Sequence, residues 1–96
     1  MAAQVSSFAT CTIKDFYESL LYFASKADDC LDIMLANSPY SDRYINAKAD
    51  YNEWEKSYDN GVKALQDKFG PGTSQQIINM INKDLELKEM RKKAFG

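Results

Sequence analysis

The sequence contains no histidine, and in 96 residues it has only two cysteines, two prolines and four glycines. Without histidine the chain lacks the usual proton shuttle near neutral pH, an imidazole metal ligand and the base of a Ser-His or Cys-His nucleophile pair. It also has no CxxC pair, no glycine-rich phosphate loop and no calcium-binding loop. The sequence therefore predicts a protein that is not an enzyme and holds no metal or other cofactor.

Strong charge of either sign is also missing, because 12 basic residues face 14 acidic ones and the net charge is -2. Such a balance creates no field that attracts nucleic acid or an anionic membrane. No apolar run approaches the length of a membrane span, and the first residues, "MAAQVSSFATC", lack a basic leader. We expect a cytoplasmic, non-secreted protein that does not act at membranes, and nucleic acid is a disfavoured partner.

The two cysteines, Cys11 and Cys30, are not expected to form a disulfide. If a helix begins after Thr12, Cys30 lies roughly 27 Å along its axis at 1.5 Å per residue. That distance is far beyond the limit of about 7 Å between the Cα atoms of bridged cysteines. We expect both thiols to stay reduced, with Cys30 as a small residue of an apolar core.

Apolar residues make up 45% of the chain and recur at helical spacing along nearly all of it. After a short N-terminal arm (1–12), the pattern predicts helices at about 13–36, 40–69 and 74–94 within one domain, 13–96. The fold class is all-α: a long antiparallel helical hairpin plus a third helix, forming a three-helix bundle. Because a chain of this length buries a limited share of its surface, we expect the bundle to be oligomeric.

The first helix has a capping-box signal, with Thr12 as N-cap and Asp15 at the third position. One apolar stripe follows spacings of three and four, and a second ribbon widens it to about half of the cylinder. Tyr22 and Ile33 instead project from the charged side. They are either singly exposed apolar residues, which are common, or a second contact surface. The main stripe comprises Ile13, Phe16, Leu20, Phe23, Ala27, Cys30 and Met34.

Asp28 interrupts the second ribbon of this helix. It lies either at the edge of the ribbon or pairs with a basic residue across an interface. Together with Asp29 and Asp32 it forms an acidic cluster, which we interpret as a solvated face and not as a cation site, because a second arm of ligands is missing.

The stretch "ANSPYSD" ends the first helix, and Ser38 or Ser41 could cap the second. A narrow stripe then runs for eight turns and keeps its helical phase across Asn60-Gly61, so the helix should continue through that pair despite a cost of about 1 kcal/mol for glycine. Gly61 would permit either close approach of a neighbouring helix or a kink. The stripe comprises Tyr40, Tyr44, Ala47, Tyr51, Trp54, Tyr58, Val62, Leu65 and Phe69.

"GPGT" ends the second helix at Gly70, and Thr73 with Gln76 forms a capping-box signal for the third. The first half of the third helix is apolar. Its second half carries charges spaced for surface pairs such as Asp84 with Lys88. We expect this end to project partly beyond the bundle and to offer Leu87, Met90, Ala94 and Phe95 to a partner.

The tyrosines and the tryptophan of the second helix permit two interpretations. With nearby cations such as Arg43 and Lys48 they could stack bases. Core packing or a protein interface is favoured, because the basic residues needed for phosphates are scattered along the chain.

The sequence thus predicts a small non-enzymatic helical protein that acts through protein–protein contacts, as a homo-oligomeric interaction or inhibitory module. Its expected partners are a second copy of itself and another protein. Two alternatives stay open: a structural subunit of a larger helical assembly, and a binder of nucleotides or single-stranded nucleic acid. The candidate interface residues are Tyr22, Ile33, Tyr40, Tyr44, Tyr51, Trp54, Tyr58, Gly61, Leu87, Met90 and Phe95.

Overall fold

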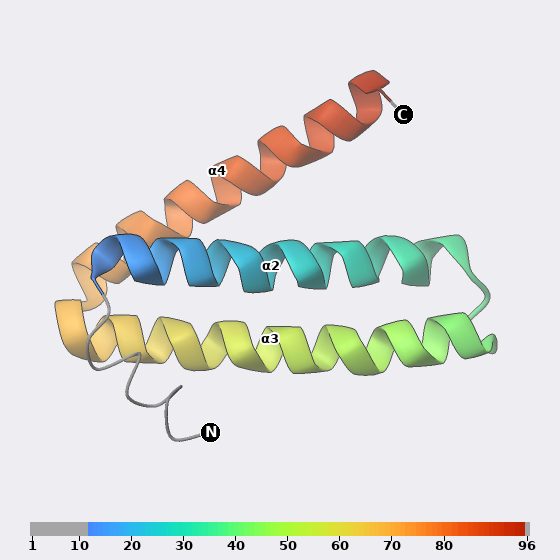
Figure 1. Ribbon diagram of the computed structural model, residues 1–96, viewed down its shortest axis with the longest axis horizontal. Helices are drawn as coiled ribbons and strands as arrows, with labels where there is room; N and C mark the ends of the chain where they lie inside the picture. Colours follow the sequence, from blue (N-terminus) through green and yellow to red (C-terminus); the bar gives the residue numbers. More distant parts are fainter. Residues whose placement is uncertain (1–11, 96) are drawn as a thin grey trace.

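A computed structural model describes residues 12–95 as three α-helices without a strand. They are α2 (Ile13–Ala36), α3 (Asp42–Phe69) and α4 (Pro71–Phe95). Figure 1 shows α2 and α3 side by side as an antiparallel hairpin, while α4 starts beside the hairpin and diverges from it toward its C-terminal end. The prediction of an all-α fold with three helices is confirmed.

The start of α2 follows the predicted capping box. The Asp15 N–H donates to Thr12 Oγ1 (3.2 Å), and the Thr12 N–H donates to Asp15 Oδ2 (2.9 Å). Both bonds satisfy amides that have no partner within the helix. At the other end Asn37 takes an extended conformation, and its side-chain amide donates to the Ile33 carbonyl (2.7 Å). Polar side chains therefore define both ends of α2.

The second helix begins at Asp42 and not at residue 40, because Ser41 is the cap. Ser41 Oγ accepts a hydrogen bond from the Tyr44 N–H (3.2 Å), as an N-cap side chain does. The alternative cap, Ser38, accepts from the Tyr40 N–H within the turn (3.3 Å). Tyr40 consequently lies in the connection and not in α3.

α3 is continuous through Asn60-Gly61, as the phase of its apolar stripe predicts. Gly61 is buried against α2, where a Cβ atom on Gly61 would lie 2.6 Å from Leu20 Cδ2. The glycine therefore lets α2 and α3 approach closely. Of the two roles predicted for Gly61, close approach of a neighbouring helix or a kink, the structure shows close approach.

The third helix begins at Pro71, three residues before the predicted start, so the capping box of Thr73 and Gln76 is wrong. Gly70 has a φ of 92°, which reverses the chain in a single residue. Its N–H donates to the Gln66 carbonyl (2.9 Å) and its carbonyl accepts from the Ser74 N–H (3.1 Å). Gly70 thus ends α3 and precedes the first turn of α4, with Pro71 in the position that proline prefers.

The core lies where the N-terminal half of α4 packs on the hairpin. In this region the rings of Phe16 and Phe69 meet edge-on, with their centroids 6.0 Å apart. Beyond this region α4 leaves the hairpin (Figure 1). The core is therefore concentrated at one end of the molecule, and its cluster of buried residues consists of Phe16, Leu20, Leu65, Ile77 and Ile81.

Candidate interaction site

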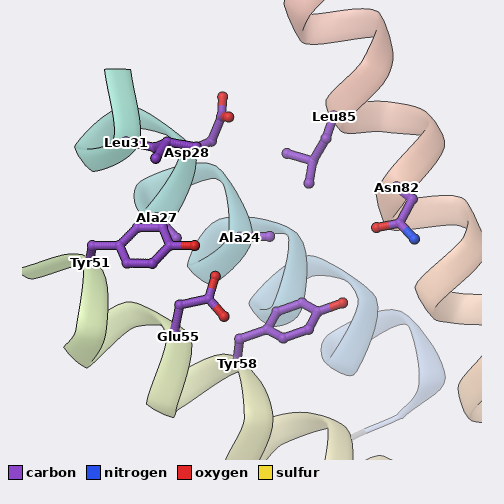
Figure 2. A pocket seen from close by; sticks show the side chains of 9 residues that line it. All are labelled: Ala24, Ala27, Asp28, Leu31, Tyr51, Glu55, Tyr58, Asn82 and Leu85. Carbon is purple, nitrogen blue, oxygen red and sulfur yellow. The ribbon is translucent and has the colours of Figure 1, made fainter. Parts of the chain in front are cut away.

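A groove lies between the hairpin and α4 at the level where the helices separate. Figure 2 shows side chains of all three helices around it, with Leu85 of α4 pointing toward α2. Its volume is about 230 Å³. We call it the wedge groove; it is lined by Ala24, Ala27, Asp28, Leu31, Tyr51, Glu55, Tyr58, Asn82 and Leu85.

The wedge groove exists because only the first half of α4 is packed tightly. Ser74, Ile77 and Ile81 are buried against the hairpin. One turn later Leu85 is only partly buried, and apolar residues of the three helices face each other without filling the space between them. Close-packed interiors rarely leave such a gap, so this part of the molecule has the shape of a receptor for side chains.

The polar groups of the wedge groove come mainly from α3. Glu55 lies between Tyr51 and Tyr58 and points into the groove (Figure 2). Burial raises the pKa of the Tyr51 hydroxyl, and a hydrogen bond with Glu55 raises it further. Burial also raises the pKa of Tyr58, assisted by the charges of Glu55 and Asp59. Both hydroxyls therefore stay protonated and can donate hydrogen bonds at neutral pH.

Two lysines bridge the opening between α4 and α2. Lys88 Nζ lies 2.9 Å from Asp29 Oδ1 and 3.8 Å from Asp28 Oδ2. Lys92 Nζ lies 3.4 Å from Asp28 Oδ2 and also pairs with Asp32. These five residues form the lysine–aspartate cluster, which connects the distal half of α4 to α2 where apolar packing has ended.

The partners of Lys92 raise its pKa well above the ordinary lysine value. The largest cause is the hydrogen bond with Asp32; burial, the second-largest, lowers the pKa, and Glu89 and Asp28 raise it further. Lys92 therefore stays charged throughout the neutral range.

The cluster decides between the two predictions for Asp28. This residue pairs with Lys88 and Lys92 of its own chain, on the helix that follows in sequence. The carboxylate oxygens of Asp28, Asp29 and Asp32 lie within 4.8 Å of one another. Asp29 and Asp32 are exposed, as the interpretation as a solvated face predicts, but ammonium groups also contact all three carboxylates, which the sequence pattern did not indicate. The pairing of Lys88 with Asp28 and Asp29 also replaces the predicted pair with Asp84.

On the other side of the hairpin, Trp54 belongs to an aromatic cluster with Tyr22 and Phe23. The Trp54 ring stacks on Phe23 (6.1 Å between centroids) and meets Tyr22 edge-on (5.7 Å). Lys26 Nζ lies 5.5 Å from the centroid of the Tyr22 ring. Tyr22 is nevertheless 51% exposed. Trp54 therefore uses its ring for packing between α2 and α3, and Tyr22 covers it from the solvent side.

The structure distributes the predicted interface residues over different surroundings. Tyr51 and Tyr58 line the wedge groove, whereas Gly61 is buried between α2 and α3. Tyr44 is partly buried, and the side chain of Phe95 lies outside the described residues, as does Cys11. Cys30 is a buried free thiol. The remaining exposed members are Ile33, Tyr40, Leu87 and Met90.

Sequence reasoning did not select several residues that form the wedge groove. The sequence pattern places Leu31 and Leu85 on apolar helix faces but does not indicate a groove, and Glu55 and Asn82 carry no signal of their own. Their role depends on where α4 leaves the hairpin, which no local pattern indicates.

The chain matches no protein-family model, no curated protein and no solved structure. None of the helices in residues 12–95 is long and apolar enough to cross a membrane.

Proposed function

We propose that the protein is a non-enzymatic module that acts by binding other polypeptides, in the first place a second copy of itself. The observation that carries this proposal is the wedge groove, where apolar side chains of three helices face an unfilled space. A small chain gains stability when a partner covers such a surface. Inhibition of another protein by occupation of its surface is one use of this kind of module.

The size and lining of the wedge groove suit the side chains of a polypeptide. Its volume is about 230 Å³, and a neighbouring hollow of about 440 Å³ on α4 shares Asn82 and Leu85 with it. A space of this size accommodates one or two large side chains of a partner. Tyrosine hydroxyls and a carboxylate at its wall are groups that protein interfaces use at the edge of an apolar contact.

Exposed apolar side chains on each helix support the same proposal. Single residues of this kind are ordinary on protein surfaces. Here the core is small and leaves the distal half of α4 without apolar packing. A partner would therefore bury apolar surface in the part of the monomer that buries least of it. The exposed set is Ile13, Tyr22, Leu31, Ile33, Leu35, Tyr40, Ile45, Met80, Leu87 and Met90.

A structural subunit remains a second candidate because Tyr22 and Ile33 lie away from the wedge groove. Each is two residues from a groove-lining residue, Ala24 and Leu31 respectively, and such a separation places side chains on roughly opposite sides of a helix. Two different contact surfaces on one subunit allow head-to-tail association, which produces open assemblies.

Sedimentation and light scattering across a dilution series test these proposals. A defined dimer or other closed oligomer supports the interaction module, and growth without limit as concentration rises supports the structural subunit. A monomer at every concentration up to near-millimolar contradicts self-association. Tyr22→Asp and Ile33→Asp, with circular dichroism to confirm folding, then show whether the surface opposite the wedge groove takes part.

The nucleotide-binding alternative has its own test in Trp54 fluorescence. Because Trp54 is partly buried between Phe23 and Tyr22, a base that stacked there would displace a ring and quench the emission. We expect no quenching by nucleotides or single strands. Salt-sensitive quenching would support nucleic-acid binding instead.

A further inference from the structure

Glu55 is the carboxylate of the wedge groove that has no cation beside it. The other carboxylate of the groove, Asp28, already pairs with Lys88 and Lys92. Glu55 is partly buried and points into the groove between two tyrosines (Figure 2). Among the residues that the structure describes, it forms no ion pair. A partly desolvated carboxylate attracts a cation more strongly than a fully hydrated one does, so the groove offers a place for a positive charge.

The groups around Glu55 suit an organic cation. The Tyr51 hydroxyl donates a hydrogen bond to Glu55, but a carboxylate accepts several such bonds and keeps lone pairs for further N–H donors. The rings of Tyr51 and Tyr58 stand on either side of the carboxylate (Figure 2), and aromatic rings attract ammonium and guanidinium groups. Asn82 adds an amide group from α4. A hard metal ion demands more oxygen ligands than this set provides, whereas an ammonium or guanidinium group does not.

Apolar residues next to Glu55 suit the stem of a long basic side chain. Ala24 and Ala27 of α2 are small and leave space in front of them, and Leu85 faces them from α4 (Figure 2). Lysine and arginine bury their methylene groups on apolar surface while the charged head stays at a polar one. The groove, with a volume of about 230 Å³, has room for one such side chain.

The surface of α3 around Glu55 is acidic. Between residues 50 and 59 the helix carries four acidic residues and one basic residue. Burial is the main cause of the raised pKa of Tyr58, and the negative charges of Glu55 and Asp59 add to it. A negative surface attracts a basic partner and speeds its association. Because the whole chain has a net charge of -2, a second copy brings no excess of positive charge.

We propose that the wedge groove binds an arginine or lysine side chain of another polypeptide with a basic surface. The cationic head pairs with Glu55 between Tyr51 and Tyr58, and the stem lies on Ala24, Ala27 and Leu85. This inference rests on the proposed function as a binder of polypeptides, and it adds the chemistry of the partner.

A short peptide with one arginine between two leucines probes the site, and NMR of the full-length, isotope-labelled protein reports binding. We expect saturable shifts of the backbone amide signals of Tyr51, Glu55 and Asn82. A peptide with citrulline, the neutral analogue of arginine, should bind about tenfold more weakly, because its hydrogen bonds to the carboxylate lack the positive charge. Equal affinity of the two peptides overturns the proposal, as does the absence of saturable shifts at millimolar peptide.

A variant of Glu55 tests the same contact from the side of the protein. Glu55→Gln keeps the size of the side chain and removes its charge, so we expect it to weaken binding of the arginine peptide about tenfold. Glu53→Gln, at an exposed carboxylate of the same helix, is the matched control and should leave the affinity unchanged. Circular dichroism should show that both variants keep their helices. An E55Q variant that binds as tightly as the wild type overturns the proposal.

Two further measurements identify the source of the cation. Free arginine amide that binds as tightly as the peptide would overturn a polypeptide partner in favour of a small cation. Self-association that E55Q weakens as much as it weakens peptide binding would assign the side chain to a second copy and overturn another polypeptide as its source. The dilution series without peptide measures self-association separately, so a failure of this inference and a failure of self-association give different results.

Discussion

Gly61 of α3 lies directly against Leu20 of α2, so that a Cβ atom on the glycine would lie 2.6 Å from Leu20 Cδ2. Leu20 is fully buried at the centre of the core and has little room to move. The closest approach of the two long helices thus depends on a missing side chain.

Gly61→Ala should therefore destabilise the protein although alanine favours a helix. Overpacking a core costs about 1–3 kcal/mol. The helix propensity of alanine returns about 1 kcal/mol. We expect the free energy of unfolding in urea to fall by about 1 kcal/mol. Asn60→Ala at the exposed neighbouring position should instead leave it equal or slightly higher, and a stabilised G61A variant would contradict close packing at this site.

The lysine–aspartate cluster should control the distal half of α4 more than global stability. Lys88→Gln with Lys92→Gln removes partners of partly exposed ion pairs, which contribute at most about 1 kcal/mol each. We expect hydrogen exchange to accelerate at the amides after Leu85, while those around Ile77 keep their protection. Lys83→Gln, at an exposed lysine of the same helix, is the control, and unchanged exchange after Leu85 would contradict the bridging role.

The same cluster implies a defined dependence on alkaline pH. Because its partners raise the pKa of Lys92 above the ordinary 10.5, the ion pairs stabilise the protein fully below pH 10.5. Their contribution is lost only as the pH rises through the higher value of the folded protein. The ratio between the hydrogen-exchange protection factors of distal α4 in the wild type and in K92Q should therefore be the same at neutral pH and at pH 9. A difference that vanishes between neutral pH and pH 9 would contradict this assignment.

The capping box at the start of α2 should show the opposite dependence. Hydrogen bonds with the Thr12 backbone and side chain lower the pKa of Asp15 below 3.8. Its charged form thus stabilises the helix above pH 3.8, and this contribution disappears as the pH falls through the lower folded-state value. The Asp15→Asn variant should therefore unfold at a lower temperature than the wild type at neutral pH, and the two unfolding temperatures should converge in acid. Thr12→Ala should cost about 1 kcal/mol at neutral pH, whereas Glu18→Gln should change little.

Cys30 should react slowly with thiol reagents in the folded protein. Burial raises the pKa of its thiol, and the charges of Asp50 and Asp29 raise it further against the opposing effect of Lys26. Less thiolate forms at neutral pH, and the sulfur is also covered. In a Cys11→Ser background, labelling should be slow without urea and fast in urea. Equally fast labelling in both conditions would show that Cys30 is accessible.

Local patterns were sufficient for the helices and for their stop signals. Thr12 and Asp15 begin α2 because capping depends on residues three apart. The unbroken phase of the stripe correctly carried α3 through Gly61, since a core-facing stripe persists only if the helix does. The predicted start of α4 was wrong because a single residue, Gly70, makes the turn and leaves no room for a separate cap.

The wedge groove and the lysine–aspartate cluster could not be obtained in the same way. Lys88 and Asp29 are 59 residues apart, and nothing local relates them. They meet because the positive φ of Gly70 and the packing of Ile77 and Ile81 direct α4 along one line across the hairpin. The helices themselves can be predicted from apolar residues spaced three and four apart in the sequence. The angle between helices instead results from side chains that are distant in sequence and meet only after folding.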